Sequence, residues 1–316
     1  MSADDNAIVT DGLILRYRGK AALDRFDLRV PAGAVMALLG DNGAGKSTCM
    51  KVLTGQLRPD RGTATILGLD CWAHSSALRP RVGYVPDRPK LYDWMTAAEI
   101  GWFASGFYPP GFLDRYDDWM TRLRLDPKKK LKDLSKGGYA RVGLALSLAP
   151  DPQVLLLDEP TSGLDLITRR EFLASLVEFA AEGRTVLISS HSIAELERAA
   201  SHAAFVRDGK VVLTATLDTL RGRFRRVSMR CAGIAPDPAS LGKPLDTVRT
   251  GRFVQYLLQD PNPLALDGLR DIPGVTDLED QPVGLEEIYA ALMGHPPEPE
   301  ADADPARNGE PEGVLP

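Results

Sequence analysis

One short segment, residues 40–48, constrains the fold of this 316-residue chain more than any other. It reads GDNGAGKST, follows the apolar run AVMALL and precedes the apolar segment CMKVLTG. Such runs predict a buried strand and then a helix, joined by a loop of small residues. The loop fits the pattern G-x-x-x-x-G-K-[ST], with Gly40, Gly45, Lys46 and Ser47 at the fixed positions. An ordinary glycine turn is the alternative interpretation.

The residue types of this loop suit an oligophosphate ligand. Glycines let successive backbone N–H groups turn inward without Cβ clashes, and the N-terminus of the following helix attracts negative charge. Lys46 can reach the β- and γ-phosphates, and the Ser47 hydroxyl can bind Mg²⁺. The candidate phosphate-binding residues are Gly40, Asp41, Asn42, Gly43, Ala44, Gly45, Lys46, Ser47 and Thr48.

A second candidate element, residues 154–165, reads VLLLDEPTSGLD. An apolar run that ends in acidic residues predicts a buried strand delivering carboxylates to the C-terminal edge of a sheet, where ligands bind. We expect Asp158 to hold Mg²⁺ through water, and Glu159 to orient or deprotonate an attacking water near the γ-phosphate. The alternative is that Asp158 only caps the strand while Glu159 is solvated.

The order of elements along the chain predicts an α/β fold, because short apolar runs alternate with helical stretches. The expected core strands are Val35–Leu39, Val154–Asp158 and Val186–Ser190. After about Leu217, FRRVSMRCAG and RFVQYLLQD resemble strands and GLEEIYAALM a helix. We therefore predict a first domain over 6–216 with an inserted helical subdomain at about 95–147, an accessory domain over 217–295, and a tail over 296–316.

The predicted tail carries the net charge of the chain, which is −5. Residues 296–316 contain six acidic residues and one base, Arg307, so the tail alone has a balance of −5. They also contain six prolines and almost nothing apolar, which predicts disorder. The rest of the chain has no basic excess, which argues against direct binding of nucleic acid.

The expected location of the chain follows from three further observations. No apolar run approaches the roughly 18 residues of a membrane span. The N-terminus MSADDNAIVT lacks the features of a signal peptide, so secretion is not expected. Cys49, Cys71 and Cys231 are scattered and odd in number. They fit a reducing compartment and argue against a zinc site or a disulfide framework.

In combination, the motifs from about Ile8 to Thr216 resemble the nucleotide-binding subunit of an ABC transporter. The resemblance implies a P-loop NTPase fold, in which a RecA-like α/β core carries an antiparallel β subdomain and an inserted α-helical subdomain. Here a small C-terminal α+β accessory domain would follow. The resemblance also implies ATP hydrolysis, with ATP and Mg²⁺ as cofactors, and expected catalytic residues Lys46, Glu159 and His191.

The resemblance implies further contacts to ATP. In the family an aromatic residue at the place of Tyr17 stacks on adenine, although packing within a strand would also explain it. The segment LSKGG at 134–138 resembles the signature Leu-Ser-Gly-Gly-Gln, with Lys136 and Gly138 as departures. Ser135 and the backbone of Gly137 would contact the γ-phosphate bound by a second subunit; a helix cap without a ligand is the alternative.

Three other residues take roles from the resemblance. His191, after the strand TVLISS, would contact the γ-phosphate and help hold the attacking water. Asp165 would lie in a loop that meets its twin across a dimer. Asp87 stands where the family usually has glutamine, and it could still reach Mg²⁺ through water although it is shorter and charged. The expected metal ligands are Ser47, Asp87 and Asp158.

The resemblance also implies partners. Two cassettes, either a homodimer or this chain with a paralogue, would enclose two ATP molecules and drive a separate transmembrane permease from the cytoplasmic face of the cell membrane. FYPPGFLDRYDDWM, DPKKKLKDLSKGG and GLEEIYAALM resemble subunits that pair with ABC-2-type export permeases. Two alternatives stay open: a soluble ABC ATPase acting on nucleic acid or the ribosome, and a regulatory cassette with little turnover.

Overall fold

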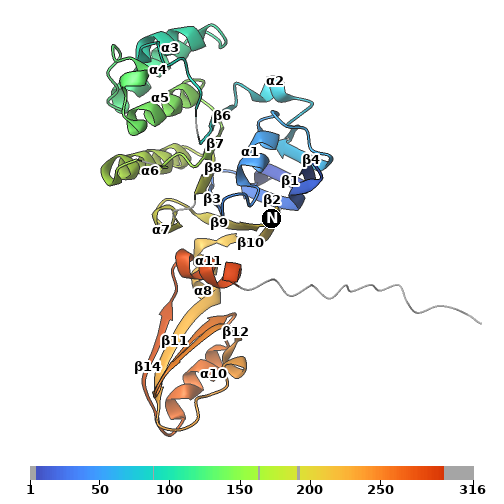
Figure 1. Cartoon of the computed structure of the whole chain (residues 1–316), viewed down its shortest axis with the longest axis vertical. Coiled ribbons are helices and arrows are strands. Elements are labelled where there is room, and N and C mark those ends of the chain that lie inside the picture. The colour runs from blue at the N-terminus through green and yellow to red at the C-terminus, as the bar shows by residue number, and fades with distance from the viewer. Residues whose placement is uncertain (1–4, 88, 163, 191–192, 295–316) are drawn as a thin grey trace, which may run out of the picture.

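The computed structural model describes residues 5–87, 89–162, 164–190 and 193–294, which form three sheets (Figure 1). The first sheet contains β2 (Lys20–Pro31), β1 (Asn6–Tyr17), β4 (Arg61–Ile66) and β5 (Leu69–Asp70), in spatial order. The central sheet contains β10 (Lys210–Thr216), β9 (His202–Arg207), β3 (Val35–Gly40), β8 (Thr185–Ser190), β7 (Val154–Asp158) and β6 (Val82–Val85). The third contains β12 (Lys243–Thr250), β13 (Phe253–Gln259), β11 (Phe224–Cys231) and β14 (Val275–Pro282).

The helices fall into three groups along the chain. Those of the first half are α1 (Lys46–Leu53), α2 (Ser75–Leu78), α3 (Ala97–Ser105), α4 (Phe112–Arg122) and α5 (Lys136–Leu148). They are followed by α6 (Leu166–Ala181) and α7 (Ile193–Leu196). The last group comprises α8 (Leu217–Arg223), α9 (Pro238–Leu241), α10 (Pro263–Gly268) and α11 (Leu285–Gly294). Short 3₁₀ turns occur at Leu131–Asp133 and Leu269–Asp271.

The central sheet is parallel except at its edge, where β10 runs antiparallel to β9. Both of its faces are buried, so successive residues of one strand enter different cores. Val35 and Leu39 of β3 belong to the cluster that includes residues of α6, whereas Met36 of the same strand packs with residues of α1. Burial on both faces explains the continuous apolar runs of the predicted strands, which the structure confirms.

Parallel pairing brings the ends of three central strands to one edge of the sheet. Leu39 of β3 pairs with Ser190 of β8, and Asp158 of β7 pairs with Ser189. The segments that leave these strands therefore begin side by side, although they lie far apart in the sequence. Loops at this edge of a parallel α/β sheet are where such folds bind ligands.

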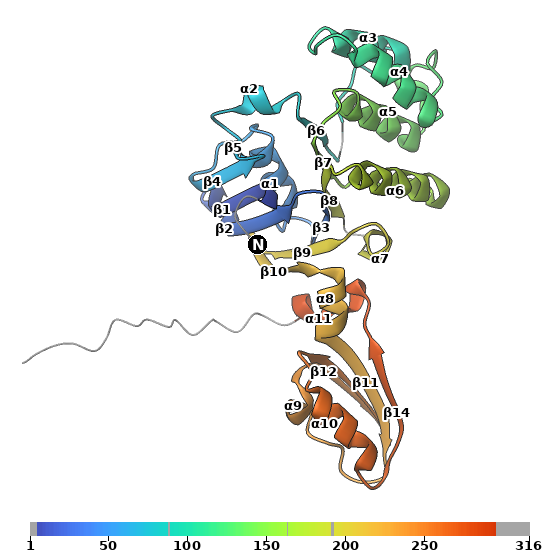
Figure 2. The same ribbon diagram turned by 180° about the vertical axis from the view of Figure 1, so that it is seen from behind.

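A group of three helices, α3, α4 and α5, lies apart from the first sheet in both views (Figures 1 and 2). Thr96 and Glu99 form a capping box that starts α3. Phe112, Tyr116 and Met120 repeat at four-residue intervals on the buried face of α4. The Tyr116 hydroxyl also donates a 2.7 Å hydrogen bond to the carbonyl of Ala97. These contacts make the helices one packed unit.

The third sheet lies at the opposite end of the molecule, with α8 and α11 between it and the central sheet (Figure 2). The predicted strands and helix in this region correspond to β11, β13 and α11. The sequence interpretation did not include β12, β14, α9 or α10, whose segments are rich in polar and turn-forming residues. The predicted tail, residues 296–316, lies outside the described residues.

Two observations bear on the environment of the chain. Within the described ranges, no helix has the length and apolar character needed to cross a bilayer. Cys49, Cys71 and Cys231 are free and buried.

The contact between α3 and α4 generates a stability prediction at Gly101. Alanine normally favours a helix over glycine, but a Cβ at Gly101 would lie 2.1 Å from Cε1 of the fully buried Tyr116 ring. We expect Gly101→Ala to destabilise this helical group by about 1–3 kcal/mol, because overpacking displaces the ring. Thermal unfolding followed by tryptophan fluorescence measures the effect, since Trp102 and Trp119 lie in these helices.

Gly222→Ala is the matched control, because Gly222 is also helical but a Cβ there meets nothing within 4 Å. It should be neutral or stabilising by up to about 1 kcal/mol. An unchanged midpoint for Gly101→Ala would contradict the steric explanation.

Candidate functional site

The loop between β3 and α1 is packed tightly against two other strands. A Cβ at Gly40 would lie 2.5 Å from the carbonyl oxygen of Val206 in β9. Gly45 has φ of 112°, and a Cβ there would lie 2.7 Å from the carbonyl oxygen of Ala22 in β2. Both glycines are therefore required sterically. The backbone of the loop is held in one place by its neighbours.

The first turn of α1 offers main-chain donors to a ligand. Its N-cap is Gly45, no side chain caps the helix, and the first turn contains no acidic residue. The N-terminal N–H groups of a helix have no intrahelical partner, and the helix dipole favours an anion there. Ser47 is exposed in this turn and Thr48 is half-buried. These features fit a phosphate group.

Lys46 points its ammonium into the loop and is buried, with a relative exposure of 5%. Its Nζ donates to the carbonyl oxygens of Gly40, at 2.5 Å, and Asp41, at 3.2 Å. The same atom lies 3.6 Å from Oε1 of Glu159. The cation of the loop and the carboxylate that follows β7 therefore belong to one site.

Asp158 and Glu159 are joined by a residue from the next strand. The Ser189 hydroxyl donates to Oδ1 of Asp158 at 2.8 Å and accepts the backbone N–H of Glu159 at 2.9 Å. Asp158 and Ser189 are both buried, and Glu159 has the unusual φ of 50°. Ser189 of β8 therefore fixes the positions of both acidic residues. We call Asp158, Glu159 and Ser189 the corner, since they lie together at the edge of the central sheet.

Asp87 lies at one wall of a cavity of about 350 Å³ that Glu159 and Lys136 also line. Asp87, where the family usually has glutamine, and Lys136, where it usually has glycine, therefore face the same cavity. Burial raises the pKa of the Tyr84 hydroxyl, and the carboxylates of Asp158 and Asp87 raise it further. Asp87 thus shares a cavity with Glu159, and its carboxylate also affects the pKa of Tyr84.

The structure gives Asp165 a local structural role but gives none to Tyr17. Tyr17, at the end of β1, is 48% exposed, so packing within a strand does not explain it. Its strand partner is Lys20, close to the part of β2 that contacts Gly45. Asp165 caps α6 by accepting the N–H groups of Ile167 and Thr168, and it also accepts the Thr168 hydroxyl at 2.7 Å. The bond from this hydroxyl, and then those from the N–H groups, lower the pKa of its carboxyl group.

The signature-like segment begins α5. Ser135 is the N-cap of this helix, and its hydroxyl accepts the N–H of Gly138 at 3.1 Å. Ser135 is exposed, whereas Gly137 is buried against Leu164 and Thr168. A helix cap accounts for the local geometry, and the exposure leaves Ser135 accessible to another molecule. His191 lies outside the described residues.

Ser189 is a site residue that sequence reasoning missed. The segment TVLISS contains two serines before His191, and only the register between β7 and β8 identifies which one meets Asp158. Pairing the last residues of the two strands would have selected Ser190, because β8 extends one residue beyond the partner of Asp158. Tyr289, whose hydroxyl reaches Asp41, carries no comparable signal in the sequence.

Ser189→Ala tests the corner. The change leaves a buried carboxylate without one of its donors, and we expect phosphate release from MgATP to fall about tenfold, as for a lost hydrogen bond to a charged group. Ser175→Ala is the control, because the Ser175 hydroxyl only donates to Phe172 within its own helix. A turnover rate equal to that of the parent protein would argue against a positioning role for Ser189.

Comparison with known proteins identifies the fold and the family. Residues 23–162 match the family model described as "ABC transporter". The chain is 35% identical over 222 residues to the daunorubicin resistance ATP-binding protein DrrA3 of Streptomyces coeruleorubidus, covering 69% of this chain and 70% of that protein. It is 29% identical to the daunorubicin/doxorubicin resistance ATP-binding protein DrrA of Streptomyces peucetius, over 92% of this chain and 93% of that protein.

Solved structures agree with the expected fold. A structure described as the ATP-binding subunit of an ABC transporter superposes with a TM-score of 0.63 at 28% identity, covering 68% of this chain and 92% of that one. A dimeric cassette described as a post-hydrolysis state bound to ADP and Pi gives a TM-score of 0.62 at 23% identity, over 66% and 98%. The predicted P-loop NTPase fold is thus confirmed, and this chain belongs to the ATP-binding proteins of ABC transporters, a family of nucleotide-binding ATPases.

Proposed function

We propose that this chain is the ATP-hydrolysing subunit of an exporter, acting as a dimer on a separate permease at the cytoplasmic face of the cell membrane. The observation that carries the proposal is the 3.6 Å approach of Lys46 to Glu159. It brings a phosphate-binding cation and a candidate general base to one site. The names of relatives support export, since they include daunorubicin resistance proteins and the lantibiotic transport protein SrtF of Streptococcus pyogenes.

Each residue of the site has a separate task in this proposal. Lys46 would exchange its contacts with the carbonyls of Gly40 and Asp41 for phosphate oxygens. Glu159, whose backbone is fixed by Ser189, would orient the attacking water and accept its proton. Because general-base catalysis contributes about 10²–10⁴-fold, loss of this carboxylate should nearly abolish turnover.

Ser47 and Asp158 have the oxygen atoms that a magnesium ion would need. Ser47 is exposed in the first turn of α1, and Asp158 is a buried carboxylate at the end of β7. Oxygen ligands of this kind suit Mg²⁺, which usually keeps several waters. When bound, the ion would neutralise charge that develops on the phosphate oxygens. Asp87 would contribute through water, in place of the amide that the family usually has.

In the proposed dimer, the exposed Ser135 would meet the second cassette. The helix that it starts, α5, lies on the far side of the central strands from α1 in both views (Figures 1 and 2). Ser135 would therefore complete the site of a second cassette, with its hydroxyl and the N-terminus of α5 facing that phosphate. ATP would then stabilise the dimer, and hydrolysis would release it.

Glu159→Gln tests hydrolysis and dimer formation together. Glutamine keeps the shape of the side chain but is a poor base, so the variant should bind MgATP and turn over at least about 100-fold more slowly. We expect it to elute as a dimer in MgATP, measured by size-exclusion chromatography with light scattering. Glu182→Gln, at an exposed helix end, should stay like the parent protein. A variant that remains monomeric in millimolar MgATP would contradict an ATP-enclosed dimer of this chain alone.

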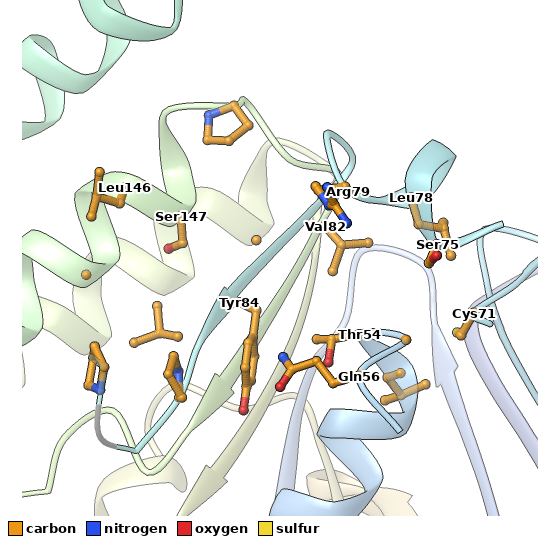
Figure 3. Close-up of a pocket in the computed structure, with 18 of the residues that line it drawn as sticks. Thr54, Gln56, Cys71, Ser75, Leu78, Arg79, Val82, Tyr84, Leu146 and Ser147 are labelled. Atoms are coloured by element: carbon orange, nitrogen blue, oxygen red, sulfur yellow. The ribbon is translucent and has the colours of Figure 1, made fainter. Parts of the chain in front are cut away.

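We propose that the permease docks in a groove next to the site. A pocket of about 470 Å³ is lined by the end of α1, by α2, by β6 and by α5 (Figure 3). Figure 3 shows Tyr84 on one strand of the floor, with Leu146 and Ser147 on one wall and Thr54 and Gln56 opposite. Tyr84 links the groove to Asp158 and Asp87, whose carboxylates influence its pKa. In this proposal, a permease that moves Tyr84 would alter the surroundings of Asp158 and Asp87.

An aromatic surface adjoins the groove along the chain, because the groove residues Leu91 and Tyr108 neighbour Tyr92 and Phe107 in sequence. Tyr92, Trp94, Phe103 and Phe107 form a chain of ring contacts with centroid distances from 5.4 to 6.1 Å. Trp94 and Phe107 are 64% and 71% exposed. Aromatic side chains of this kind supply much of the binding energy at protein interfaces. We assign the surface, together with the groove, to the permease contact.

The double variant Trp94→Ala/Phe107→Ala tests this contact. Because both rings are largely exposed, the purified variant should keep the ATPase rate of the parent. Recovery of the permease with the tagged chain from detergent-solubilised membranes should fall at least about tenfold, as expected when interface hot spots are truncated. Ile234→Ala is the control, since Ile234 is 96% exposed in the loop after β11. Equal recovery with the double variant and the control would refute the assignment.

A further inference from the structure

The last described helix, α11, reaches back to the phosphate loop. The Tyr289 hydroxyl donates a 2.6 Å hydrogen bond to Oδ1 of Asp41, a residue 248 positions earlier in the chain. Its ring lies 6.3 Å, between centroids, from the ring of Phe205 in β9. Figures 1 and 2 both place α11 next to the central sheet, between β10 and the third sheet. The region after residue 217 therefore touches the loop directly.

Helix α11 is fixed to both parts that it joins. On the side of the central sheet, Nη1 of Arg207 donates to the carbonyl oxygen of Leu292 at 3.1 Å. On the side of the third sheet, Nε of Arg226 in β11 donates to Oε1 of Glu287 at 3.0 Å. Ile288 is fully buried in the core cluster that also contains Phe205. These contacts thus connect the third sheet to the helix that carries Tyr289.

Asp41 also participates in holding the lysine of the loop. Its backbone carbonyl accepts a hydrogen bond from Lys46, while its side-chain carboxylate accepts one from Tyr289. A carboxylate in a loop that receives phosphates is unfavourable, because like charges repel and because it competes for the lysine. A hydroxyl donor that fixes the carboxylate on the side of α11 reduces both effects.

We propose that Tyr289 is a positioning residue of the nucleotide site, which holds Asp41 so that Lys46 and the loop backbone can accept phosphate. The proposal rests on the function proposed above and gives the region over 217–294 a role in setting nucleotide affinity. Burial and the bond to Asp41 raise the pKa of the Tyr289 hydroxyl, so it remains a donor at neutral pH. The ring contact with Phe205 does not need the hydroxyl, so phenylalanine at this position isolates the hydrogen bond.

Tyr289→Phe is the test, with titration of a fluorescent MgATP analogue and steady-state phosphate release as measurements. We expect nucleotide affinity to fall about three- to tenfold, in line with a partly exposed hydrogen bond to a charged group. The turnover number at saturating MgATP should stay within about twofold of the parent value, since Glu159 and Asp158 keep their contacts with Ser189. A merely structural role would instead lower the melting temperature and leave affinity unchanged.

Tyr256→Phe is the matched control. Its hydroxyl donates a 2.6 Å hydrogen bond to the carbonyl of Pro236, within the same region but away from the loop. This variant should keep the nucleotide affinity of the parent.

A double-mutant cycle with Asp41→Ala tests the route of the effect. In the Asp41→Ala background, Tyr289→Phe should change affinity by less than about twofold, because the acceptor is gone. An equal effect in both backgrounds, or no effect in the parent background, would overturn the positioning role while leaving the proposed function intact. If the parent protein itself bound no MgATP, the proposed function would fail instead.

Discussion

The close approach of the phosphate loop to β2 and β9 is the constraint on which the nucleotide site depends. The gaps at Gly40 and Gly45 are too narrow for any side chain, since the nearest carbonyl oxygens would lie 2.5 and 2.7 Å from a Cβ. The N–H of Gly209 also donates to the carbonyl of Ala44 at 2.9 Å. The loop is therefore held by main-chain contacts, which makes a preorganised binding site possible without large local side chains.

The parallel arrangement of the central strands also brings charged side chains to the edge of the sheet where the phosphate loop lies. Lys46 is buried, and a buried ammonium is costly unless it has partners. It finds them in two carbonyl oxygens of its own loop and in the nearby carboxylate of Glu159. Through one hydroxyl, Ser189 fixes Asp158 at the end of β7 and Glu159 directly after it. Cation and carboxylates are thus arranged by the register of three neighbouring strands.

Two other parts of the chain lie near the nucleotide site at the edge of the central sheet. They are the groove beside α5 and helix α11. Tyr84 lines the groove beside α5, and burial together with the nearby carboxylates of Asp158 and Asp87 raises the pKa of its hydroxyl. Helix α11 is connected to the nucleotide site through Tyr289 and Asp41. Signals from a permease and from the third sheet would therefore enter at separate points. In the proposed assembly, the permease and the third sheet of the same chain would influence one site without sharing a surface.

The sequence by itself determined the loop, the core strands and the acidic pair, because each depends on residues close together in the chain. Local spacing places Gly45 and Lys46 at the start of α1, and an apolar run ending in acid places Asp158 at a strand end. Only the tertiary structure decided that Ser189 bridges Asp158 and Glu159, and that Tyr289 bonds to Asp41. Those contacts join residues 30, 31 and 248 positions apart, and no local pattern specifies which distant side chain the folded backbone will bring within hydrogen-bond distance.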